Sequence, residues 1–194
     1  MACNKRKKSV NCQNGLTLVE LIVGFSIIGI ISVLIASPYF SFFRLFLNQF
    51  TAIDVASENR LALNEITNQS RQSESVSVLT IPCGGDPSGS NKLCLQLWPL
   101  DQNGKPFRSS DKDYIIYKRD PQNNTKIIKI TRAATSSSRK SSTKTVGTDI
   151  TNLQFAYNPN NQNILITVTV TTSRVYDNKT QTTTQSADAF LRNK

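Results

Sequence analysis

The chain contains no histidine, which removes the side chain that most often serves as a general base or metal ligand near neutral pH. Its Asp, Glu and Cys residues are not grouped with the spacing of a zinc site or a calcium-binding loop. Neither a P-loop nor a Gly-x-Ser-x-Gly motif occurs, and the glycine-rich stretch at residues 83–89 follows neither pattern. We therefore expect no catalytic residue, no metal and no cofactor, and predict that the protein is not an enzyme.

Acidic residues are also scarce, with 13 Asp and Glu against 23 Lys and Arg and a net charge of +10. Four of the cations stand together at residues 5–8, and the first 15 residues contain no acid. Cations directly before an apolar segment hold that end of the segment in the cytoplasm. This leader therefore predicts a cytoplasmic N-terminus, with the chain beyond roughly residue 45 on the outer side. The length of 194 residues leaves room for one modest domain beside such a segment.

Residues 16–37 form an apolar run in which Glu20 is the only charged residue. As a helix the run is long enough to cross a hydrocarbon layer of about 30 Å. An unpaired carboxylate inside that layer costs about 2.5 kcal/mol or more. A plain anchor would be better served by Leu at this position, so we expect Glu20 to meet a positive partner, which the start of a mature chain could supply.

The stretch GLTLVELIV at residues 15–23, behind the basic leader, resembles the prepilin leader and N-terminal helix of type IV pilins and type II secretion pseudopilins. The resemblance implies that prepilin peptidase cuts between Gly15 and Leu16 and that the new amine of Leu16 is N-methylated. It also implies that Glu20, five residues past the cut, pairs with the amine of a neighbouring subunit. Leu16 stands where the family most often has Phe.

The same resemblance implies the partners and the location of the protein. The partners are prepilin peptidase, other pilin or pseudopilin subunits, an assembly platform in the inner membrane, and membrane lipid. The location is the bacterial cytoplasmic membrane, as a single-pass protein, and then a periplasmic or cell-surface filament. The part after the helix and the closing residues 189–193 look most like J-type pseudopilins and larger minor pilins. Glu20 argues against the K-type tip subunits, which typically lack this acid.

Two other interpretations fit part of the N-terminal segment. A secretory signal peptide also combines a basic start with an apolar core, but that core typically has about 7 to 15 residues and ends at a small-x-small site. The run here is longer and contains an acid. An ordinary signal anchor accounts for the basic flank and the length, but it leaves Gly15 and Glu20 without a reason.

The sequence predicts an α+β fold with a long, kinked N-terminal helix packed on an antiparallel β-sheet. Its four parts are the cleaved leader (1–15), a transmembrane and assembly helix (16–38), an amphipathic helix (39–72) and a β-rich globular head (73–194). Pro38 is the predicted kink, because proline removes a helical hydrogen bond. Small and apolar residues of the amphipathic part recur on one side: Ala52, Val55, Ala56, Ala62, Leu63 and Ile66.

A period of two predicts strands at residues 76–81, 93–98, 114–117, 126–130, 153–157 and 164–170. In the last of these, apolar residues alternate with threonines, so one face is buried and the other is wet, as in an antiparallel sheet. The apolar helix stripe is the surface expected to cover this sheet. Two low-complexity stretches, residues 133–145 and 177–186, are predicted to be mobile loops.

The four cysteines divide between the two ends of the expected topology. Cys3 and Cys12 lie in the leader, on the reducing side. Cys83 and Cys94 lie in the exported part and flank a polar turn. Because that side is oxidising, we predict a disulfide between Cys83 and Cys94.

Three functions remain open: a structural filament subunit, a DNA receptor of a competence filament, and a plain membrane-anchored surface protein. The second depends on residues 105–144, which hold eleven cations and three acids. Arg139, Lys140 and Lys144 would contact phosphates if this band lay on one face. No aromatic cluster with stacking spacing accompanies the cations, so nucleic acid is a possible partner but not the favoured one.

Overall fold

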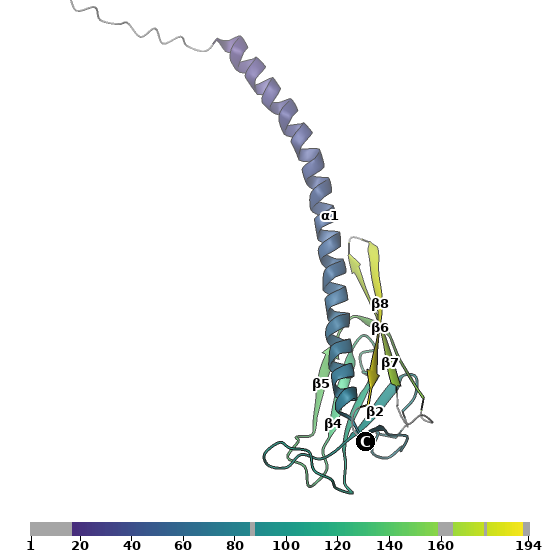
Figure 1. The fold of residues 1–194 in the computed structure, drawn as a ribbon. Helices are drawn as coiled ribbons and strands as arrows, with labels where there is room; N and C mark the ends of the chain where they lie inside the picture. The colour runs from purple at the N-terminus through teal and green to yellow at the C-terminus, as the bar shows by residue number, and fades with distance from the viewer. Residues whose placement is uncertain (1–16, 86–87, 159–164, 177, 192–194) are drawn as a thin grey trace, which may run out of the picture. The chain divides into compact units, whose positions relative to one another are not determined.

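The computed structural model describes residues 17–85, 88–158, 165–176 and 178–191. The chain divides into two units, Met1–Leu47 and Asn48–Lys194. One long helix, α1 (Leu18–Gln72), occupies the described end of the first unit and continues into the second. Every strand among the described residues belongs to the second unit (Figure 1).

The part of α1 in the second unit carries the predicted apolar stripe. Val55, Ala62, Leu63 and Ile66 are buried, which confirms its centre, while Ala52 and Ala56 are half-buried. Polar residues extend the stripe, a feature that the apolar pattern did not predict. Each of them is buried and donates a hydrogen bond to a carbonyl oxygen: Asn59 to Thr183, Thr67 to Leu63, and Ser70 to Ile66.

The strands form two antiparallel sheets, so the prediction of a single sheet is wrong. The five-stranded sheet has the order β1 (Ser75–Val76), β2 (Lys92–Leu97), β3 (Asp113–Arg119), β4 (Ile127–Arg132) and β5 (Ser142–Gly147). The three-stranded sheet consists of β6 (Ile150–Tyr157), β7 (Leu165–Tyr176) and β8 (Lys179–Phe190) in that order.

A tight connection between β5 and β6 separates the two sheets. A Cβ atom on Gly147 would lie 3.3 Å from the Cβ of Ala62, so the backbone passes close against α1 at this point. Asp149 then adopts a positive φ of 54°, in the left-handed region that Asp tolerates better than most residues. The chain turns there, and β6 pairs with β7 rather than with β5.

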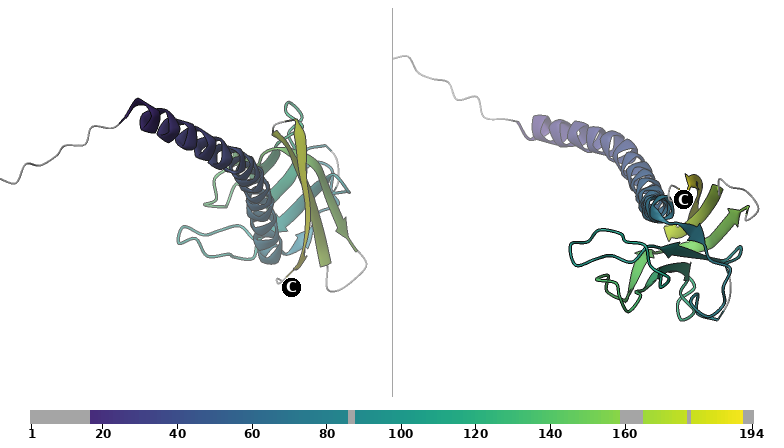
Figure 2. Two further views of the ribbon diagram at one scale, coloured as in Figure 1. Left: turned by 90° about the horizontal axis from the view of Figure 1, so that it is seen from above. Right: turned by 60° about the horizontal axis from the view of Figure 1, so that its bottom comes forward.

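One hydrophobic core joins α1 to both sheets. Ala62, Leu63 and Ile66 of the helix pack in the same cluster as side chains of the strands. Figure 2 shows the two groups of strands in two further orientations, with β7 and β8 in yellow-green and yellow. The core members from the strands include Leu93, Leu95 and Leu97 of β2, Ile115 and Tyr117 of β3, Leu153 and Phe155 of β6, and Ile166, Val168 and Val170 of β7. The predicted helix packed on antiparallel strands is therefore confirmed.

Five of the six predicted strands occur, although β7 runs six residues past its predicted end at residue 170, and the first predicted strand is wrong. At residues 76–81 only Val76 lies in a strand, and Val78, Leu79 and Ile81 are exposed. Local bonds compete with strand pairing here, because the buried Ser77 hydroxyl accepts a hydrogen bond from the Leu79 amide. The alternation of apolar residues belongs to an exposed turn.

Both predicted low-complexity loops contain strands, so the loop prediction is wrong at the end of the first stretch and over most of the second. Residues 142–145 belong to β5, and residues 179–186 belong to β8, which pairs along its whole length with β7. The reason is that threonine is β-branched and favours strands. On the outer face of the hairpin, hydroxyl groups also bond across the strands, as Thr171 does with Thr184 at 3.0 Å. Asn178, with a positive φ of 58°, supplies the turn.

The disulfide between Cys83 and Cys94 is confirmed, with a Cα–Cα distance of 5.9 Å. Both cysteines are buried and pack with Ile116 in a second, smaller cluster. The bond links the turn after β1 to β2 across a sequence separation of 11. Closing a loop of this length stabilises the fold by about 2 to 3 kcal/mol in the chain-entropy model.

Candidate functional site

The described part of α1 in the first unit is an apolar surface that the chain itself leaves exposed. Its large apolar side chains, from Leu18 to Ile35, are between 49% and 75% exposed. This segment is long and apolar enough to cross a membrane. Such an exposed surface requires lipid or other helices as its surroundings.

Two serine hydroxyls inside this segment are satisfied within the helix. The Ser26 hydroxyl donates to the carbonyl oxygen of Ile22, and the Ser32 hydroxyl donates to that of Ile28, both at 2.8 Å. Bonds of this kind remove the cost of placing a hydroxyl among hydrocarbon. Both serines are therefore compatible with lipid or with a neighbouring helix.

Glu20 stands at the start of α1 and forms a reciprocal capping box with Thr17. The amide and the hydroxyl of Thr17 both donate to Oε2 of Glu20 at 3.0 Å, and the Glu20 amide donates to the Thr17 hydroxyl at 3.3 Å. Such a box satisfies backbone donors that the first helical turn leaves open. The sequence signal was a Thr three residues before a Glu at the start of an apolar run, which our sequence analysis did not use.

The capping box engages only one of the two carboxylate oxygens. Among the described residues, Oε1 of Glu20 has no protein donor. The carboxylate can therefore cap its own helix and still accept a hydrogen bond from a group outside the subunit. Gly15 and Leu16, the predicted cleavage residues, lie outside the described residues. Pro38 lies within α1, and its role as a kink stays a prediction.

Salt bridges hold several cations of the basic band in fixed positions. Nε of Arg139 lies 3.1 Å from the carboxylate of Asp113, whose side chain is fully buried. Two lysines pair with acids outside the band, Lys112 with Glu74 at 2.7 Å and Lys129 with Glu65 at 2.6 Å. Lys140 and Lys144 are exposed. The three residues predicted to contact DNA thus include one arginine that is already paired with an acid through Nε, which weakens the case for a continuous phosphate-binding face.

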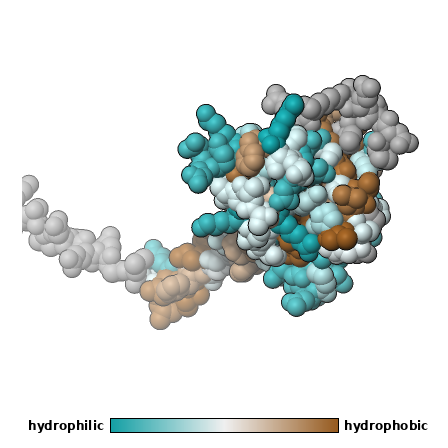
Figure 3. Space-filling view, turned by 90° about the horizontal axis from the view of Figure 1, so that it is seen from below, coloured by the Kyte–Doolittle hydropathy of each residue, from teal (hydrophilic) through white to brown (hydrophobic). Residues whose placement is uncertain are grey.

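The face of the molecule drawn in Figure 3 is mostly polar, with smaller apolar patches. A polar, solvated surface of this kind needs no ligand. Within the described residues, no group of three or more His, Cys, Asp or Glu side chains is placed to hold a metal ion.

Arg174 of β7 lies at the centre of a cluster of carboxylates that was not predicted from the sequence. It contacts two carboxylates on α1, those of Asp54 and Glu58, and its Nε donates to Asp149 at 2.8 Å. The hydrogen bonds that Arg174 donates to Asp149 and then to Asp54 raise the pKa of Arg174 above its usual range. The cluster ties β7 and the turn before β6 to the helix, so we assign it to the fold rather than to a site.

The comparison with protein families identifies the N-terminal segment. Residues 10–36 match the family described as the prokaryotic N-terminal methylation motif, which is the prepilin-type signature of type IV pilins and pseudopilins. No curated protein and no solved structure matches the chain. The motif supports a type IV pilin-like or pseudopilin protein, and it implies processing by prepilin peptidase and assembly with other pilin subunits. It points to a structural subunit rather than an enzyme.

Proposed function

We propose that this protein is a minor pilin or pseudopilin, a structural subunit of a type IV pilus or a type II secretion-like filament. The observation that carries the proposal is the prepilin signature at residues 10–36, which overlaps a helix whose exposed apolar surface holds a single acid at its start. Prepilin peptidase cuts after Gly15, Leu16 is N-methylated, and Glu20 pairs with the amine of a neighbouring subunit.

The proposed topology places the leader in the cytoplasm and the second unit outside the inner membrane. The cations at residues 5–8 support this orientation. The Cys83–Cys94 disulfide supports it independently, because disulfides persist in oxidising compartments. An assembly platform in the inner membrane then moves the subunit from the bilayer into the filament.

A DNA receptor is the second candidate, and the structure gives it less support. The cations counted for it include Arg139, Lys112 and Lys129, and each of these is paired with a carboxylate. Non-specific DNA binding depends on several cations that are free to neutralise phosphates. We therefore favour the scaffold role.

Filament fractionation tests the proposed function. We expect the protein to sediment with filaments sheared from cells of its own source, in smaller amount than the main subunit. In cells without prepilin peptidase we expect it to stay in the inner membrane. An unrelated single-pass membrane protein serves as the control and must be absent from the filament fraction. If the protein remains in the membrane fraction of both strains while filaments are abundant, the proposal is wrong.

A further inference from the structure

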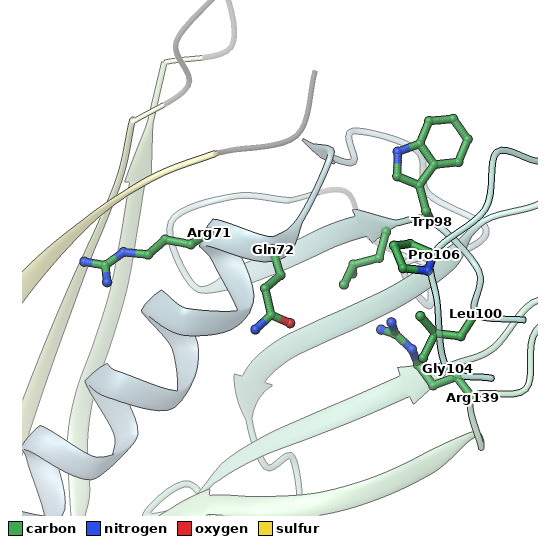
Figure 4. Close-up of a pocket in the computed structure, with 8 residues that line it drawn as sticks. Arg71, Gln72, Trp98, Leu100, Gly104, Pro106 and Arg139 are labelled. Carbon is green, nitrogen blue, oxygen red and sulfur yellow. The ribbon is translucent and has the colours of Figure 1, made fainter.

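A cavity of about 450 Å³ lies in the second unit, next to the C-terminal end of α1. Three parts of the chain contribute to its wall: the last two residues of the helix, the end of β2 with the loop that follows it, and the loop before β5. Figure 4 shows residues that line it. Those that matter for its chemistry are Gln72, Leu97, Trp98, Leu100, Pro106 and Arg139.

Arg139 is held in this wall by a fully buried acid. Its Nε lies 3.1 Å from Oδ2 of Asp113, and its side chain is only 20% exposed. Among the described residues, both Nη groups of Arg139 have no protein acceptor. In Figure 4 the guanidinium points toward the side of Gln72. Neither Nη group is among the buried side-chain atoms that lack a partner, so both reach solvent and can donate to an acceptor that enters the cavity.

The loops that form the wall are fixed by hydrogen bonds before any ligand arrives. Asp113 accepts from the Ala134 amide and the Ser137 hydroxyl, both at 2.8 Å. The two loops are joined as well, because the Ser138 amide donates to the carbonyl oxygen of Leu100 at 2.8 Å. A donor held in this way loses little conformational freedom when it binds.

We propose that this cavity binds an acidic peptide segment of a partner protein. The carboxylate of an Asp or Glu side chain would accept hydrogen bonds from both Nη groups of Arg139, the bidentate geometry that arginine favours. The apolar residues beside that acid would pack on Leu100 and Pro106. The excess of cations over acids in residues 105–144 gives the surroundings a positive potential that attracts such a segment.

A nucleic acid fits this cavity less well than a peptide does. Strand binding needs several phosphate contacts and open aromatic faces on which bases stack. Arg71 and Arg139 both line the cavity, but in Figure 4 the Arg71 side chain points away from Arg139, so the two guanidinium groups do not converge on one phosphate. The Trp98 ring is covered on one side by the ammonium group of Lys112, which is itself paired with Glu74.

Trp98 is the only tryptophan of the chain, so intrinsic fluorescence reports on this cavity directly. The probe is the acetylated and amidated heptapeptide GSLELSG, titrated into the full chain in detergent micelles at constant ionic strength. The matched probe GSLQLSG differs only by its missing charge. We expect saturable binding of the acidic probe in the millimolar range, and binding of the neutral probe at least about tenfold weaker, the effect of losing a charged hydrogen bond.

Variants at two neighbouring positions distinguish a direct contact of the probe with Arg139 from non-specific attraction by the positive charge of the surface. Arg139→Gln is expected to abolish the preference for the acidic probe, and Lys140→Gln, with the same change of charge at an exposed position, to keep it. Because Arg139→Gln leaves the buried Asp113 without a cation, Arg139→Lys is measured in parallel. Lys keeps the positive charge but lacks the two Nη donors of arginine, so the preference for the acidic probe should fall in this variant too. Equal binding of both probes, or a fluorescence response to duplex DNA but not to the acidic probe, overturns the proposal.

Discussion

Replacing Glu20 by Gln is expected to lower incorporation of the subunit into filaments by at least about tenfold, while membrane insertion and cleavage continue. In our proposal the Glu20 carboxylate pairs with the amine of a neighbouring subunit in surroundings of low dielectric. There, removal of one charge leaves the other unpaired and is costly. The measurement is the amount of subunit in sheared filaments, normalised to the amount of cleaved subunit in the membrane.

The capping box makes Gln the informative substitution. Gln can still accept the hydrogen bonds from Thr17 at the helix start, so Glu20→Gln removes the charge and keeps the cap. Thr17→Val keeps the charge and removes the two hydrogen bonds of the Thr17 hydroxyl, and we expect it to reduce incorporation far less. Glu20→Val removes both and should assemble no better than Glu20→Gln. If Glu20→Gln assembles like the wild type and Thr17→Val does not, Glu20 acts only within its own helix and the pairing between subunits is refuted.

Replacing Ile66 by Ala is expected to lower the free energy of unfolding of the second unit by about 2 to 5 kcal/mol. Ile66 is fully buried where α1 meets both sheets. Removing its outer carbons leaves a cavity that the surrounding strands fill only in part. The measurement is urea unfolding of the full chain in detergent, followed by the fluorescence of Trp98, which lies just after β2.

Leu61 supplies the control for this experiment on the same helix. Its side chain is 66% exposed, so Leu61→Ala should change the free energy of unfolding by less than about 0.5 kcal/mol. Both substitutions shorten a large aliphatic side chain to Ala in a helix interior. Similar small losses in the two variants would mean that α1 does not pack on the sheets as described.

The helix and its stripe were predictable from sequence because both depend on local regularities. The apolar run with its lone Glu20 lies in one continuous segment, and so do the helically spaced Val55, Ala62 and Ile66. The disulfide was predictable because the basic leader predicts that Cys83 and Cys94 lie on the oxidising side of the membrane. In these cases a short stretch of sequence is enough to predict the structure.

The strands rich in threonine were not predictable from composition. The composition of residues 179–186 is typical of a solvated linker. These residues nevertheless form most of β8, because they pair with β7, and composition alone does not indicate such a pairing. Residues 78–81 show the opposite error, since their apolar residues alternate as in a strand but are exposed and lie in no strand. The Arg174 and Arg139 clusters depend on contacts between distant segments, Asp54 and Asp113 among them, which no local pattern contains.

The central claim, that this chain is made as a prepilin and processed as a pilin-type subunit, is tested most directly at its N-terminus. Proteolysis after glutamate of the protein purified from membranes releases the first peptide for mass spectrometry. We predict a pentapeptide of residues 16–20 that carries an N-methyl group on Leu16, and its absence from a Gly15→Leu variant. A first peptide that reads through Gly15 from Met1 or Ala2, or a chain that begins at Pro38, would contradict the claim.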